Sequence, residues 1–97
     1  MLLLTMNEWV GPGDRYPSDQ PQPAGSERII AVATRLPFVQ ALERVRAYEA
    51  AYNAHYRLAV NLRLLTVCPI PETDDELLES LQVEIVEKLA QTAADFA

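Results

Sequence analysis

The side chains with the greatest potential for chemistry are one histidine and one cysteine. His55 and Cys68 are each the only residue of their type among 97. A general base needs a nucleophile and an orienting carboxylate within hydrogen-bond reach, and the spacing around His55 offers neither. Zinc sites need several Cys or His ligands at short spacings such as CxxC. A single cysteine cannot form an internal disulfide, so Cys68 indicates a packed side chain in a reducing compartment. We therefore expect no enzymatic activity, no metal and no cofactor.

Acidic residues gather after the Cys-Pro-Ile-Pro segment. They lack the alternating oxygen ligands and central glycine of a calcium loop. Thr73 and Glu76 instead have the spacing of a capping box, which predicts a helix that starts near residue 74. The acidic side chains also suit the positive end of that helix. The cluster consists of Glu72, Asp74, Asp75, Glu76 and Glu79.

Three tyrosines recur every four residues, at Tyr48, Tyr52 and Tyr56. This spacing places them on one face of a helix. Such a face could stack nucleobases or a pigment, but core packing or a protein interface is the simpler interpretation.

Charge is divided unevenly along the chain, which has a net charge of −6. Residues 26–71 sum to about +3 and residues 72–97 to about −7. Direct nucleic-acid binding is disfavoured by this balance, because it needs many cationic side chains. Arg46 and Arg57 form a polar stripe with nearby asparagines that could meet an acidic helix. Without an apolar run of ~20 residues or a secretory signal, the sequence indicates a cytoplasmic or virion-associated protein.

Hydrophobic periodicity predicts an all-α fold. Apolar side chains at helical spacing indicate a long helix over about 37–65 and an antiparallel second helix over about 74–96, which together form a helical hairpin. Residues 26–36 suit either a short helix or a strand, and we favour the helix. Prolines and glycines concentrate in residues 1–25, which predicts an extended N-terminal arm before a helical domain of residues 26–97. Glu49 interrupts the apolar face of the long helix and would need a partner.

Two helices with wide apolar faces cannot cover each other completely, so the hairpin should bind other chains. We expect a small non-enzymatic structural or assembly subunit, either a homo-oligomer or part of a larger complex, with a docked N-terminal arm. The alternative is an acidic inhibitory or regulatory protein, such as a nucleic-acid mimic or antitoxin-like binder, that occupies a basic groove. The expected partner-binding residues are Leu3, Trp9, Arg46, Arg57, Leu58, Leu62 and Leu65.

Overall fold

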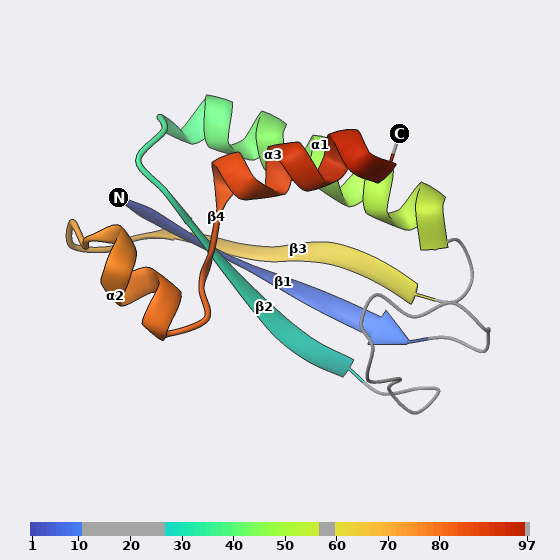
Figure 1. Cartoon of the computed structure of the whole chain (residues 1–97), viewed down its shortest axis with the longest axis horizontal. Helices are drawn as coiled ribbons and strands as arrows, with labels where there is room; N and C mark the ends of the chain where they lie inside the picture. Colours follow the sequence, from blue (N-terminus) through green and yellow to red (C-terminus); the bar gives the residue numbers. More distant parts are fainter. Residues whose placement is uncertain (11–26, 57–59, 97) are drawn as a thin grey trace.

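A computed structural model describes residues 1–10, 27–56 and 60–96, which form a four-stranded sheet and three helices (Figure 1). The sheet has the order β3-β1-β2-β4. Its first three strands pair antiparallel, and β4 joins β2 in parallel. The predicted all-α helical hairpin is therefore wrong. In chain order the elements are β1 (Leu2–Val10), β2 (Glu27–Thr34), α1 (Phe38–Tyr56), β3 (Val60–Pro69), α2 (Asp75–Ser80), β4 (Glu84–Ile85) and α3 (Val86–Phe96).

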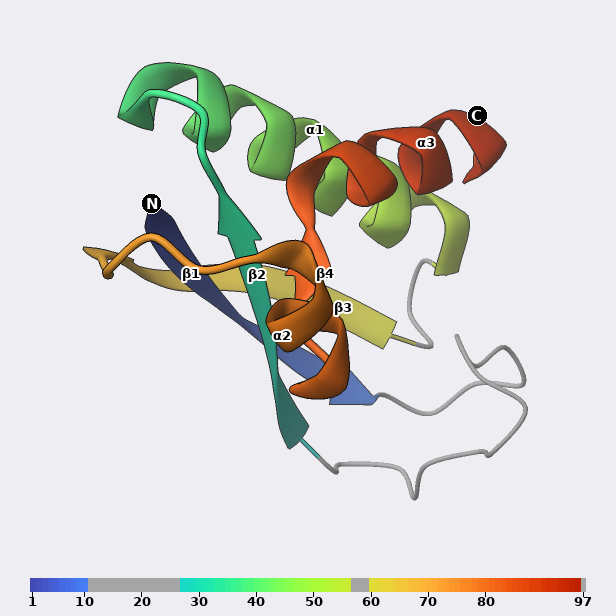
Figure 2. The same ribbon diagram turned by 60° about the vertical axis from the view of Figure 1, so that its left-hand side comes forward.

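The helices are distributed unequally over the sheet. Helices α1 and α3 lie side by side over one face, whereas α2 lies near the β2 and β4 strands (Figures 1 and 2). The main core fills the space between the sheet and helices α1 and α3. Its buried members come from every layer and are Leu4, Met6, Val32, Val45, Tyr48, Tyr52, Leu62, Val86 and Leu89.

Strand β1 lies between β3 and β2 in the sheet, whereas the sequence predicts that residues 1–25 form an extended arm outside the domain. Leu4 and Met6 are fully buried on the helix side, while the alternate residues Thr5 and Asn7 are only partly buried. This alternation is the period of a strand with one covered face. The rest of the predicted Pro-rich arm lies outside the described residues.

The predicted long helix ends early, and its last part belongs to a strand. Helix α1 ends at Tyr56, and β3 pairs with β1 from Val60 to Pro69. Leu62 is buried in the core from this strand. The helix propensity of this segment is overridden because pairing with β1 provides hydrogen-bond partners for its backbone N–H and C=O groups. Between the two possibilities weighed for residues 26–36, the strand is confirmed and the favoured helix is wrong.

The predicted second helix is divided into α2, β4 and α3. It starts where expected, but the N-cap is Asp74, whose carboxylate accepts a 2.8 Å hydrogen bond from the Leu77 amide. Thr73 instead donates to the carbonyl of Pro71, so the prediction that Thr73 caps the helix is wrong. Helix α2 stops before Gln82, whose φ of 60° lies in the left-handed region that is incompatible with a continuing helix.

A smaller cluster covers one end of the second sheet face. Ala33 and Ile85 are opposite one another in the parallel pairing and both are buried. They lie on the face away from Val32, because successive side chains of a strand alternate. Leu78 of α2 is buried as well, and α2 packs against β4. Among the described residues, no helix or strand covers the remainder of this second face, which is called the open face below (Figure 2). Across the described ranges, no helix has the length and hydrophobicity needed to cross a membrane.

Candidate functional site

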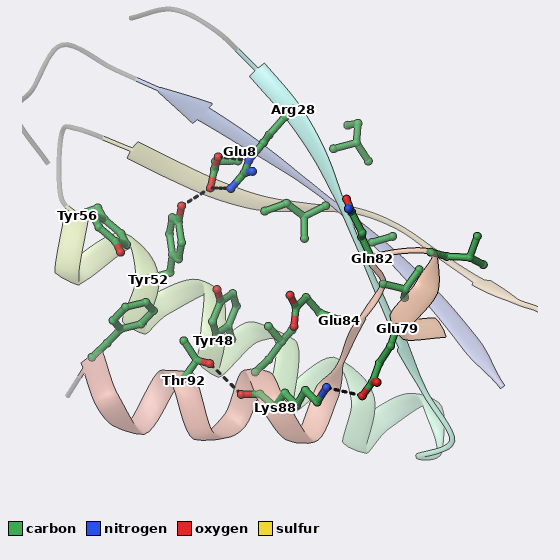
Figure 3. Close-up of a pocket in the computed structure, with 17 residues that line it drawn as sticks. Glu8, Arg28, Tyr48, Tyr52, Tyr56, Glu79, Gln82, Glu84, Lys88 and Thr92 are labelled. Atoms are coloured by element: carbon green, nitrogen blue, oxygen red, sulfur yellow. Dashed lines mark hydrogen bonds and ion pairs between the residues drawn. The ribbon is translucent and has the colours of Figure 1, made fainter. Parts of the chain in front are cut away.

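A buried carboxylate lies where β1, β2 and α1 meet. Glu8 is fully buried and is directly opposite Arg28 in the β1–β2 register. The guanidinium of Arg28 donates to both carboxylate oxygens, with Nη2 3.2 Å from Oε2. The hydroxyl of Tyr52 donates to the same Oε2, and the three side chains point toward one another in Figure 3. Burying a carboxylate is costly unless it is paired and hydrogen-bonded, and these contacts meet that requirement.

The tyrosines around Glu8 are held in their neutral form. Burial, together with the bond to Glu8 and its charge, raises the pKa of Tyr52 well above the ordinary value of a phenol. Burial, reinforced by the negative charge of Glu84, raises the pKa of Tyr48 to about 12. The bond to Glu8 also raises the pKa of Arg28. Each phenol is therefore a hydrogen-bonding and packing group near neutral pH, with no ionised form available to act as a nucleophile.

A groove of about 800 Å³ opens beside this network. One wall is β2 from Arg28 to Ala31, and another is α3, including Leu89 and Phe96. The tyrosines of α1 form its inner end, and the segment between α2 and β4 borders the other side (Figure 3). Two of its acidic groups are paired, since Lys88 donates to Glu79 at 2.8 Å and Arg28 pairs with Glu8, whereas Glu84 adds a further negative charge to the lining. The groove therefore combines aromatic and aliphatic walls with a few charged groups, as ligand pockets commonly do.

The uncovered face of the sheet is the second candidate surface. Trp9, Ile29 and Arg63 lie there on three adjacent strands, on the side opposite the Glu8 network. Trp9 is 38% exposed and Ile29 is 60% exposed. Thr5 and Thr66 share a hydrogen bond of 2.5 Å between their hydroxyls on the same face. A smaller depression of about 280 Å³ is lined by Asn7, Trp9, Glu27, Asn61 and Arg63.

His55 and Cys68 have different surroundings. The ring of His55 stacks on Phe96, with centroids 4.8 Å apart, and it contacts Tyr56 edge-on at 4.8 Å. Cys68 is an exposed free thiol on β3, so the prediction that it is a packed side chain is wrong. Within the described ranges, no group of three or more His, Cys, Asp and Glu side chains could hold a metal ion.

The structure brings some of the expected partner-binding residues to one surface. Leu3 and Trp9 lie on the same side of the sheet, but Leu3 is partly buried at the covered end, opposite Ala33. Leu65 is the extra residue of a bulge and is 44% exposed. Leu62 is turned into the core. Arg46 pairs with Glu49 on the same helix at 3.5 Å. The predictions for Arg57 and Leu58 fall outside the described residues.

Sequence reasoning missed the Glu8 network and the exposed Ile29. The only available signal was the alternation of Leu4, Met6 and Glu8 with Thr5 and Asn7, which places Glu8 at a core-facing position. Its partner Arg28 is brought opposite only by the register of β1 against β2. The comparisons with protein families, curated proteins and solved structures found no match for this chain.

Proposed function

We propose that this chain is a small non-enzymatic assembly subunit whose open sheet face packs against the same face of a second copy. The observation that supports this is the exposure of Trp9, Ile29 and Leu65 on or beside one face, while α1 and α3 cover the other. An antiparallel sheet can leave one face in water, but that face is then usually polar. A tryptophan and two aliphatic side chains together on such a face favour a contact surface.

Charge complementarity favours a second copy as the occupant. Glu27 lies on β2 and Arg63 on β3, on opposite sides of the central strand β1. In a face-to-face dimer with a twofold axis along β1, β2 of one copy faces β3 of the other. Because β2 faces β3, Glu27 of each copy then lies near Arg63 of the other. The contact occurs twice, since an isologous interface repeats every contact. Helix α3 lies on the opposite face of the sheet, and the acidic helix α2 lies at the Ala33 end of the dimer face, away from Glu27 (Figure 2).

The size of the face sets the strength of the dimer. Three strands ~4.8 Å apart, each with about eight residues at a rise of ~3.3 Å, cover roughly 400 Å², and the end beneath α2 is not accessible, so the open area is smaller still. Stable interfaces bury about 800 Å² on each partner. We therefore expect a weak dimer that dissociates at micromolar concentrations.

Charge exchange tests the geometry of this dimer. Glu27→Arg and Arg63→Glu should each turn two attractive contacts into repulsive ones and weaken the dimer by about 1 to 2 kcal/mol, or roughly 5- to 30-fold. Mixing the two single variants should restore association, because every contact in the mixed dimer again joins opposite charges. Sedimentation velocity over a wide concentration range provides the measurement. A wild-type chain that stays monomeric near millimolar concentration would refute the proposal, as would single variants that dimerise alone as strongly as the mixture.

An acidic regulatory binder is the second candidate. It is favoured by Glu76 and Glu87, which are exposed and form no ion pair among the described residues. This candidate predicts that Glu76→Gln with Glu87→Gln abolishes capture of a basic protein partner and leaves self-association unchanged. Retention of the captured partner by the double variant would exclude it.

A further inference from the structure

The two edges of the sheet are treated differently. At the β3 edge, the side-chain amide of Asn53 both donates to the Leu62 carbonyl at 2.9 Å and accepts from the Leu62 amide at 2.6 Å. The Glu49 carboxylate accepts from the Leu64 amide at 2.7 Å. These side chains of α1 bind backbone groups that a neighbouring strand would otherwise bind. They therefore block the β3 edge at Leu62 and Leu64. Protection of this kind is how proteins prevent unwanted strand pairing.

The opposite edge is protected over only a small part of its length. Strand β2 has eight residues, but β4 pairs with it only at Val32 and Ala33. From Glu27 to Ala31 the outer edge of β2 has no strand beside it in the described sheet.

The hydrogen-bond pattern identifies which backbone groups of this edge point away from the sheet. The amides of Leu62 and Leu64 donate to side chains of α1, which shows that they point away from β1. The backbone groups of Glu8 and Met6 must then point toward β2, since antiparallel pairs alternate. Their partners Arg28 and Ile30 point back at β1. The N–H and C=O of Ile29, which lies between them, therefore point outward from the sheet.

The groove lies directly beside this edge. It is lined by Arg28, Ile29, Ile30 and Ala31 of β2, and on its far side by Leu89 and Thr92 of α3. A strand placed along β2 would direct the side chain opposite Ile30 toward the helices, because paired residues share a face. That side chain would enter the part of the groove lined by Tyr48 and Leu89, where the carboxylate of Glu84 also lies beside Tyr48 (Figure 3 shows Tyr48 and Glu84).

We propose that the groove binds an extended peptide of a partner protein, which adds to the free edge of β2 as a further strand. Main-chain hydrogen bonds with Ile29 supply affinity, and the space beside Tyr48 selects an apolar side chain at the position opposite Ile30. The occupant is an extended segment because the unpaired groups form a strand edge, which only another strand can pair continuously. The two sites share Ile29, whose backbone groups belong to the strand edge and whose side chain belongs to the dimer face, but peptide binding does not require the dimer.

A proline substitution isolates the main-chain contribution. Ile29→Pro removes an N–H that points away from β1, so the β1–β2 hydrogen bonds remain, and proline is tolerated on edge strands. Ile29→Thr is the matched control, because it changes the side chain and keeps the N–H. Thr92→Arg tests the groove from the helix side, since Thr92 is a partly buried wall residue on α3.

The probe is a phage-displayed library of random heptapeptides, selected against the full chain and followed by fluorescence anisotropy with the synthesised peptides. We expect selected peptides with alternating apolar residues, at least tenfold weaker binding by Ile29→Pro, at least fivefold weaker binding by Thr92→Arg, and less than threefold change for Ile29→Thr. Arg63→Glu, which weakens the dimer, should leave peptide binding unchanged.

Amide hydrogen exchange provides a measurement that needs no prior peptide. In the free protein the Ile29 amide should exchange much faster than that of Ile30, and a selected peptide should slow it at least tenfold. The proposal is overturned if the two amides are equally protected in the free monomer, or if no peptide is selected. It is also overturned if selected peptides bind Ile29→Pro as tightly as wild type. Protection of Ile29 that rises with protein concentration in Arg63→Glu, which weakens the face-to-face dimer, would overturn it too, because it would identify a second copy as the occupant of the edge.

Discussion

Removing one hydroxyl from the Glu8 network should destabilise the fold measurably. Tyr52→Phe keeps the ring in the core and deletes only the donor to the Glu8 carboxylate, which is fully buried. A hydrogen bond to a charged group contributes about 1.5 to 3 kcal/mol. Since Arg28 still binds both oxygens, we expect a loss of about 2 kcal/mol in the free energy of unfolding. For a domain of this size, that loss lowers Tm by about 8 to 16 °C.

Tyr48→Phe is the matched control for this prediction. Tyr48 occupies the same helix face one turn earlier, and its hydroxyl makes no hydrogen bond to a described residue. It should change the unfolding free energy by less than about 0.5 kcal/mol. Urea unfolding followed by circular dichroism at pH 7 measures both variants, and Tyr52→Phe should cost less in a Glu8→Gln background because the two side chains are coupled. Equal effects of the two tyrosine variants would refute the inferred role of the Tyr52 hydroxyl.

Three further outcomes follow from the contacts described above. The pKa of Tyr48 is about 12 in the folded state against about 10 when unfolded. The free energy of unfolding should therefore fall as pH rises from about 10 through 12, by up to about 2.7 kcal/mol. The urea midpoint of Tyr48→Phe should fall less over the same pH range. Asp74→Ala should cost about 0.5 to 2 kcal/mol in thermal melts, whereas Thr73→Ala should cost less, and the reverse order would contradict the observed cap. Asn53→Ala removes the hydrogen bonds to the Leu62 backbone and should destabilise the fold by about 1 to 3 kcal/mol, measured by urea unfolding. It should also promote aggregation, measured by light scattering, because the strand edge is then exposed. A soluble variant of wild-type stability would contradict the blocking role of Asn53.

The sequence predicted local features of the helices better than their extent. The four-residue spacing of Tyr48 and Tyr52 indicated one buried helix face, and the structure confirms that they pack in the core. The helix start after Asp74 is confirmed within one residue. Glu49 was recognised as needing a partner, and the Leu64 amide is that partner. These features depend on neighbours within one or two turns, which a sequence pattern contains.

The sheet could not be deduced in the same way because its evidence is non-local. In β3 the alternation of Leu62, Leu64 and Val67 is interrupted by the extra residue Leu65, so a period of two is not visible. In β1 the run of three leucines hides the alternation, and Glu8 stands at a core-facing position where an apolar residue is expected. Its burial becomes favourable only when Arg28 is placed opposite it by strand pairing. The candidate sites therefore depend on a register that no local pattern specifies.

The central position of β1 also determines the order in which this chain can fold. Its partners on β3 are 50 to 67 residues later in the sequence, so the pairing of β1 cannot be completed until the chain up to Pro69 has been synthesised. Until then β1 has at most one neighbour, and its Leu-rich face is exposed. Pairings between such distant segments slow folding, because the entropy of closing the intervening chain is lost before the contacts form. We therefore expect refolding that is slow for a chain of this length, limited by the docking of β3 onto β1.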